Sequence, residues 1–120
     1  NINVQTLLGD ALTPYIENKI NLDIIISNPP YILNEDDAQS SVRKYEPASA
    51  LWLDKNHSVY ESIFRDYKKV KKGDILMVFE ISPDLQEWLV SLMKRYMDKP
   101  EYHFEKDLNG FVRFLFVYEE

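Results

Sequence analysis

Apolar residues fall into short runs that predict strands and into longer spaced series that predict helices. The strands are expected at Val4–Leu8, Leu22–Ser27, Asp74–Ile81, Tyr102–Lys106 and Phe111–Tyr118. The second run is β-branched and apolar on both faces, which is typical of a strand buried inside a parallel sheet. Asn109-Gly110 stands between the last two runs and predicts that they form a hairpin.

Two helices are expected, one after the second predicted strand and one after the third. Ser58 and Glu61 form a capping-box pattern, and Gly73 ends the helix that follows. Ser82 caps the other helix, with Pro83 at a position where the missing N–H costs nothing. Its apolar face comprises Leu85, Trp88, Leu89, Leu92, Met93 and Tyr96. The order of the expected elements is strand, helix, strand, helix and then a hairpin. This order predicts an α/β sheet that is mostly parallel with an antiparallel C-terminal hairpin.

Composition limits the class of protein without naming it. The chain has 120 residues, the size of one domain, and 45% of them are hydrophobic. It has no cysteine, which excludes disulfides and thiolate chemistry, and His57 and His103 have no convincing set of further ligands, so no metal site is expected. No apolar run approaches the roughly 20 residues of a membrane helix, and residues 1–4 have neither the basic start nor the long apolar stretch of a signal peptide, so we expect a cytoplasmic protein. A net charge of −6 argues against a nucleic-acid partner.

The motif Asn28-Pro29-Pro30-Tyr31 carries the candidate chemistry. It follows the buried strand, and open α/β sheets bind ligands at the carboxyl ends of their strands. An amide or aromatic amine nitrogen is a poor nucleophile because its lone pair is delocalised. The Asn28 side-chain oxygen and the Pro29 carbonyl offer two acceptors for its N–H groups, and Tyr31 can lie against a planar substrate. Positioned acceptors of this kind suit the transfer of a methyl group to nitrogen.

The motif and its surroundings resemble the HemK family, the glutamine N5-methyltransferases of peptide-chain release factors. Asn-Pro-Pro-Tyr alone is shared with adenine-N6 DNA methyltransferases, whereas the other matching segments are more particular to HemK-like proteins. In chain order, the resemblance rests on Asp23–Ile32, Tyr45–Ala48, Ala50-Leu51, Tyr60–Ile63, Gly73–Leu76, Glu80-Ile81 and Asp107–Gly110 with Arg113.

The resemblance implies a cofactor, a partner and roles for individual residues. Residues 28–31 would hold the glutamine amide of a release factor, and Asn28 would also touch S-adenosylmethionine. Asp10 and Ala11 would lie near the adenine of that cofactor, although Asp10 after Gly9 also fits an ordinary turn. Glu46 would line the substrate site, or it is a polar loop residue held extended by the proline that follows it.

The chain has three glycines and no glycine-rich cofactor loop. By resemblance, residues 1–120 correspond to the C-terminal part of an incomplete Rossmann-like class I methyltransferase sheet. That loop and a helical N-terminal domain would lie upstream. We therefore expect the chain alone to be inactive and to bind cofactor weakly or not at all. An exposed isoleucine-rich edge at Leu22–Ser27 predicts self-association.

Two other functions remain open at this point. One is methylation of an exocyclic amine on a nucleic-acid base, which needs base flipping and a basic groove. The other is a half-domain that has kept a binding role without catalysis.

Overall fold

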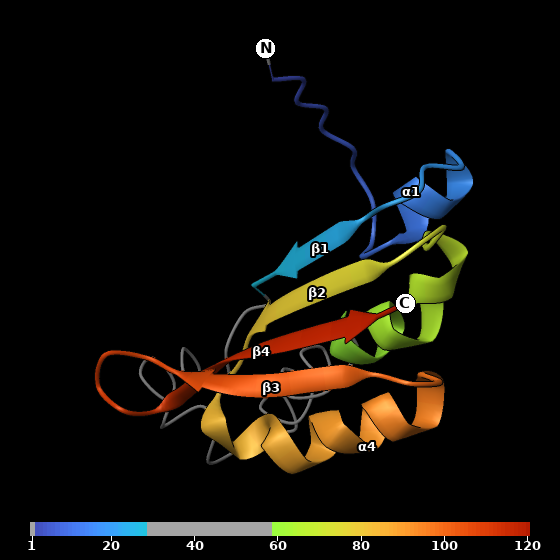
Figure 1. The fold of residues 1–120 in the computed structure, drawn as a ribbon. Coiled ribbons are helices and arrows are strands. Elements are labelled where there is room, and N and C mark those ends of the chain that lie inside the picture. Colours follow the sequence, from blue (N-terminus) through green and yellow to red (C-terminus); the bar gives the residue numbers. More distant parts are fainter. Residues whose placement is uncertain (1, 29–58) are drawn as a thin grey trace, which may run out of the picture.

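A mixed four-stranded sheet forms one layer of the fold (Figure 1). The computed structural model describes residues 2–28 and 59–120. The strands are β1 (Ile24–Ser27), β2 (Ile75–Glu80), β3 (Glu101–Lys106) and β4 (Val112–Glu119), and their order across the sheet is β1-β2-β4-β3.

The α/β class and the antiparallel C-terminal hairpin are confirmed. β1 pairs with β2 in parallel, whereas β4 runs antiparallel to both β2 and β3. β1, β2 and β3 therefore run in the same direction, as a mostly parallel sheet requires, and β4 alone among the described strands is reversed because the hairpin turn sends it back between β2 and β3.

The strand predicted at Val4–Leu8 is not formed. No strand partner is described beside this segment, and Val4 and Leu8 are 85% and 102% exposed. A strand without a neighbour leaves its backbone N–H and C=O groups unpaired, so an apolar run alone is insufficient to form a strand. A short helix that the sequence pattern did not predict follows, α1 (Thr13–Glu17). A Cβ on Gly9 would lie 2.7 Å from Cγ of the buried Pro14, so the glycine permits this close approach.

The two predicted helices are present, with differences at their ends. Residues 59–66 are helical and continue into a 3₁₀ turn at Tyr67–Lys69, before Gly73; Ser58 lies outside the described residues. The other helix begins with a 3₁₀ turn at Pro83–Leu85 and continues as α4 (Gln86–Tyr96). Ser82 precedes it in an extended conformation, as expected, but its hydroxyl donates to Asp84 Oδ1 (2.6 Å) instead of capping the backbone.

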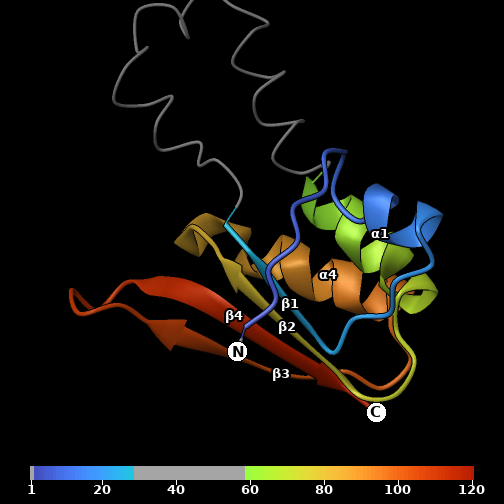
Figure 2. The ribbon, with the colours of Figure 1, turned by 90° about the horizontal axis from the view of Figure 1, so that it is seen from above.

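The helices gather on one side of the sheet, as Figure 2 shows. The strand residues facing them are buried, including Ile25, Met77, Leu115 and Val117. Phe64 stacks on Phe79 with ring centroids 5.1 Å apart. Leu89, Leu92 and Met93 from the predicted apolar face of α4 complete this core. No described helix has the length and apolar content needed to cross a membrane.

β1 forms one edge of the described sheet. Ile24 and Ile26 point away from the helices and are 57% and 77% exposed, whereas Ile25 between them is 7% exposed. The predicted exposed isoleucine edge is therefore present within the described part of the chain.

Candidate functional site

The carboxyl ends of β1 and β2 lie side by side, and Asn28 stands at this edge. Ser27 is paired with Phe79, and Asn28 follows it with an exposed side chain. β4 begins at the same edge, where the Ile81 N–H donates to the Arg113 carbonyl over 2.7 Å. Asn28 thus follows a parallel strand, as the sequence predicted. It lies at the edge where open α/β sheets in general bind their ligands.

An apolar depression of about 270 Å³ lies against β1. Its lining comes from α1 and the turn before it, from β1, and from residues 59–66: Ala11, Leu12, Tyr15, Leu22, Ile24, Ile25, Ile26, Ser27, Val59 and Ile63. The depression therefore extends from Ala11, in the turn predicted to lie near the cofactor, to Ser27, the residue that precedes Asn28.

The turn that contains Asp10 and Ala11, predicted to lie near the cofactor, has a defined conformation. The Thr13 N–H donates to the Asp10 carbonyl over 2.9 Å, and Ala11 has a φ of 49°, in the left-handed region. Ala11 is half-buried and contributes to the depression, whereas Asp10 is exposed. Of the two residues predicted to lie near the cofactor, Ala11 thus lines the depression against β1, whereas Asp10 does not.

Four other predicted site residues, Pro29, Pro30, Tyr31 and Glu46, lie outside the described residues. Of the candidate residues, the structure brings Ala11 and the end of β1 together around one depression.

Tyr60 is a residue at this edge whose role the sequence pattern did not reveal. It is 1% exposed, and its hydroxyl donates to the backbone carbonyl of Glu80 over 2.7 Å. Burial, and then the charge of Glu80, raise the pKa of Tyr60, so the hydroxyl keeps its proton. Its ring packs against Phe79 and Trp88. Tyr60 thus fixes the end of β2 next to Asn28; in the sequence it stands out only as part of the segment Tyr60–Ile63 that carries the resemblance.

The β3–β4 turn closes the same edge of the sheet. Asp107 Oδ1 accepts the N–H groups of Asn109 (2.9 Å) and Phe111 (3.1 Å), and Oδ2 lies 3.3 Å from Arg113 Nε. Gly110 has a φ of 86°, a conformation that favours glycine, and its N–H donates to the Asp107 carbonyl. One carboxylate thus holds the whole turn.

Acid is expected to loosen this turn. The Phe111 N–H, together with Asn109 and Arg113, holds the pKa of Asp107 below its usual 3.8. A carboxyl group whose pKa is lowered by folding stabilises the fold above its usual pKa, and this contribution is lost as the pH falls through the lowered value. Hydrogen exchange measured by NMR should show the Phe111 amide losing protection at low pH. An Asp107→Asn variant has no charge to lose, so the same acid transition in that variant would contradict the assignment.

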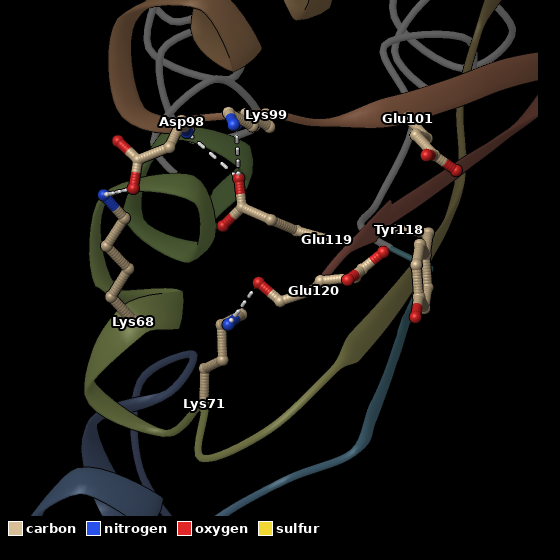
Figure 3. A pocket seen from close by; sticks show the side chains of 8 residues that line it. All are labelled: Lys68, Lys71, Asp98, Lys99, Glu101, Tyr118, Glu119 and Glu120. Atoms are coloured by element: carbon tan, nitrogen blue, oxygen red, sulfur yellow. Dashed lines mark hydrogen bonds and ion pairs between the residues drawn. The ribbon is translucent and has the colours of Figure 1, made fainter.

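A larger cavity than the depression against β1 lies elsewhere. It measures about 570 Å³ and lies where β4 ends and β2 begins, at the opposite end of the sheet from Asn28 (Figure 3). Most of the residues that line it are charged, and two of its lysines have partners within the cavity wall. Lys68 pairs with Asp98 (3.0 Å), and Lys71 Nζ donates to the Glu120 carbonyl.

Glu119 beside this cavity is 5% exposed and joins three segments of the chain. Its carboxylate accepts the Tyr67 hydroxyl and the backbone N–H groups of Asp98 and Lys99, each of the latter over 3.0 Å (Figure 3). Burial, and then the hydrogen bond from Tyr67 to Glu119, raise the pKa of Tyr67, so Tyr67 remains a donor. This cluster has a structural role.

The fold and the Asn28 edge define an α/β protein with its candidate ligand site at the ends of two parallel strands. No family model matches the chain. It is 38% identical over 110 residues to the release factor glutamine methyltransferase of Staphylococcus aureus, covering 89% of this chain and 40% of that relative. The corresponding enzyme of Bacillus subtilis is 36% identical over 112 residues, covering 90% and 38%. That of Enterococcus faecalis is 33% identical over 105 residues, covering 85% and 37%.

The chain thus spans about two fifths of the length of these relatives. Over this span it is a relative of the HemK family of release factor glutamine methyltransferases, as its motifs predicted.

Proposed function

We propose that this chain forms the substrate-holding part of an S-adenosylmethionine-dependent methyltransferase that methylates N5 of a glutamine in a peptide-chain release factor. The observation that carries the proposal is the position of Asn28, at the carboxyl end of β1 and beside the parallel β2. The similarity to release factor glutamine methyltransferases supports the reaction and the substrate.

In this proposal, residues 1–120 are the C-terminal part of a Rossmann-like class I methyltransferase domain. The strand order β1-β2-β4-β3 supports this classification, since the parallel pair at one side is joined to an antiparallel hairpin at the other. The exposed β1 edge is where further parallel strands would add. Such an enzyme would act in the cytoplasm, on a component of translation.

The proposed role of the motif is to hold the glutamine amide for attack. Asn28 Oδ1 and the Pro29 carbonyl accept the two N–H groups and fix the direction of the nitrogen lone pair. Pro30 keeps the backbone rigid, and Tyr31 lies against the planar amide and excludes water. S-adenosylmethionine supplies a methyl group on a positively charged sulfur. Transfer would join the amide nitrogen to that methyl group with loss of the C–S bond, and the nitrogen, made acidic by alkylation, would give its proton to water. Acceptors in fixed positions therefore suffice without a strong base.

The residues around the depression fit one side of that cofactor. Ala11 and β1 give an apolar surface for the adenine, the exposed Asp10 precedes Ala11 in the same turn and supplies a candidate acceptor, and Asn28 stands at the strand end. The volume of about 270 Å³ is below the range of roughly 300–1,000 Å³ usual for small-molecule sites. The 120 residues alone are therefore expected to bind the cofactor weakly and to be inactive.

The function is tested with the full-length protein that contains this chain. Labelled S-adenosylmethionine is supplied with a purified release factor or with DNA, and transfer of the label is measured. The proposal expects label in the release factor, at a glutamine identified by mass spectrometry. Label in DNA alone would instead support an adenine methyltransferase, and label in neither substrate would favour a non-catalytic module.

The isolated 120-residue chain is expected to self-associate through β1. Ile24 and Ile26 present an exposed apolar edge with unpaired backbone groups, which favours strand pairing between copies. Sedimentation should therefore show a dimer or larger species, and Ile26→Lys should shift the chain toward monomer. Leu8→Lys is the matched control, because Leu8 is fully exposed but lies outside the sheet. A stable wild-type monomer would contradict the expectation.

A further inference from the structure

The tip of the β3–β4 hairpin, defined here as residues 107–111, carries two large exposed apolar side chains. Leu108 is 105% exposed and Phe111 is 57% exposed. Turns at a protein surface usually consist of small and polar residues, because such residues hydrogen-bond to the turn's backbone or adopt conformations that larger residues avoid. A single exposed leucine needs no explanation, but two large apolar side chains on one five-residue tip indicate a contact.

The tip is held in one conformation. The Asp107 carboxylate accepts two backbone N–H groups of the tip and pairs with Arg113, and the Asp107 N–H donates to the Phe111 carbonyl over 2.8 Å. Fixing a loop before binding lowers the entropy that association must overcome. The fixed backbone holds Leu108 and Phe111 at set places on the turn, which suits recognition of another surface.

The tip also lies at the end of the sheet that carries Asn28. Lys106 and Val112 are the last pair of the hairpin, and Arg113 stands opposite Ile81, just beyond the end of β2. Figure 1 shows the hairpin loop extending past the sheet at the end toward which β1 and β2 run. A partner whose side chain reaches Asn28 therefore approaches the molecule from the side where Leu108 is exposed.

We propose that this tip is a docking contact for the protein substrate, through which Leu108 and Phe111 bind the surface of the folded release factor. The inference rests on the proposed function, because it assumes a protein substrate at Asn28. It adds a site of recognition that is separate from the residues holding the amide. The tip selects the folded protein, whereas residues 28–31 select the glutamine.

The experiment compares two substrates of the full-length protein. One is the intact release factor, and the other is a short peptide containing the acceptor glutamine, which is too small to reach the tip. The specificity constant kcat/KM is measured for both substrates with wild type, Leu108→Asp and Leu108→Ala/Phe111→Ala. The proposal expects the ratio of protein to peptide kcat/KM to fall about tenfold, mainly through KM for the protein, which corresponds to about 1.4 kcal/mol of binding.

Tyr102→Asp is the matched control. Tyr102 is a 43% exposed aromatic residue on the same hairpin, but it lies at the end remote from the tip, so the ratio should stay at the wild-type value. An unchanged ratio in the tip variants would overturn the proposal. So would an equal loss on both substrates, since the tip would then support the fold or pack against the protein's own chain. If wild type methylates neither substrate, the proposed function itself fails, which is a distinguishable result.

Discussion

Asn28→Ala is expected to lower methyl transfer to the release factor by at least about a hundredfold. Removal of one positioned hydrogen-bonding group from a preorganised site typically costs a factor of 10²–10³ in rate. Asn28 is exposed and follows the last paired residue of β1, so the fold should not change. Single-turnover rates with saturating cofactor, together with circular dichroism of the variant, test both parts of this expectation.

Asn21→Ala is the control for the loss of an asparagine. Asn21 is also exposed and precedes β1 at its other end, so it is far from the proposed chemistry along the strand. This variant should retain the wild-type rate. If Asn28→Ala keeps more than half of that rate, the amide-holding role of Asn28 is wrong.

Glu119→Ala is expected to destabilise the fold by about 3 kcal/mol. The substitution leaves the Tyr67 hydroxyl and the N–H groups of Asp98 and Lys99 without their acceptor in a site where Glu119 is 5% exposed. Buried donors left without partners typically cost about 1–3 kcal/mol each, offset in part by water entering the space. Urea denaturation of the full-length protein, followed by circular dichroism, measures the change.

Two variants separate the hydrogen-bonded cluster from general effects of charge. Tyr67→Phe removes one donor to the carboxylate and should cost about 2 kcal/mol, less than Glu119→Ala. Glu120→Ala removes the neighbouring exposed carboxylate and should change stability by less than about 0.5 kcal/mol. Equal effects of Glu119→Ala and Glu120→Ala would show that the buried hydrogen bonds are unimportant.

The sequence was most informative where burial and local pattern agree. Asp74–Ile81 was predicted as a strand, and β2 occupies Ile75–Glu80 within it because alternate side chains enter one core. The hairpin followed from Asn109-Gly110, and Gly110 has the positive φ that such turns need. Asn28 was placed correctly because proline cannot continue a central strand.

Features that depend on distant residues were not predictable in the same way. Val4–Leu8 has the composition of a strand, but strands require a neighbour, and composition does not supply one. The antiparallel position of β4 between β2 and β3 depends on tertiary packing. The contact from Tyr60 to the Glu80 carbonyl spans 20 positions, and no local pattern indicates it.

The three consecutive isoleucines of β1 have a consequence for insertions and deletions. A shift by one residue along β2 would exchange the two faces of the strand, yet it would replace isoleucine by isoleucine at the buried position. The burial of apolar side chains therefore does not distinguish the two registers. The register is set instead by backbone hydrogen bonds where the strand begins, from Leu22 N to Val70 O and from Leu76 N to Asp23 O. A protein that lacks one of these isoleucines would still form the strand and fold, but Asn28 would point to the opposite face of the sheet. The proposed site would then lose its function without loss of the fold.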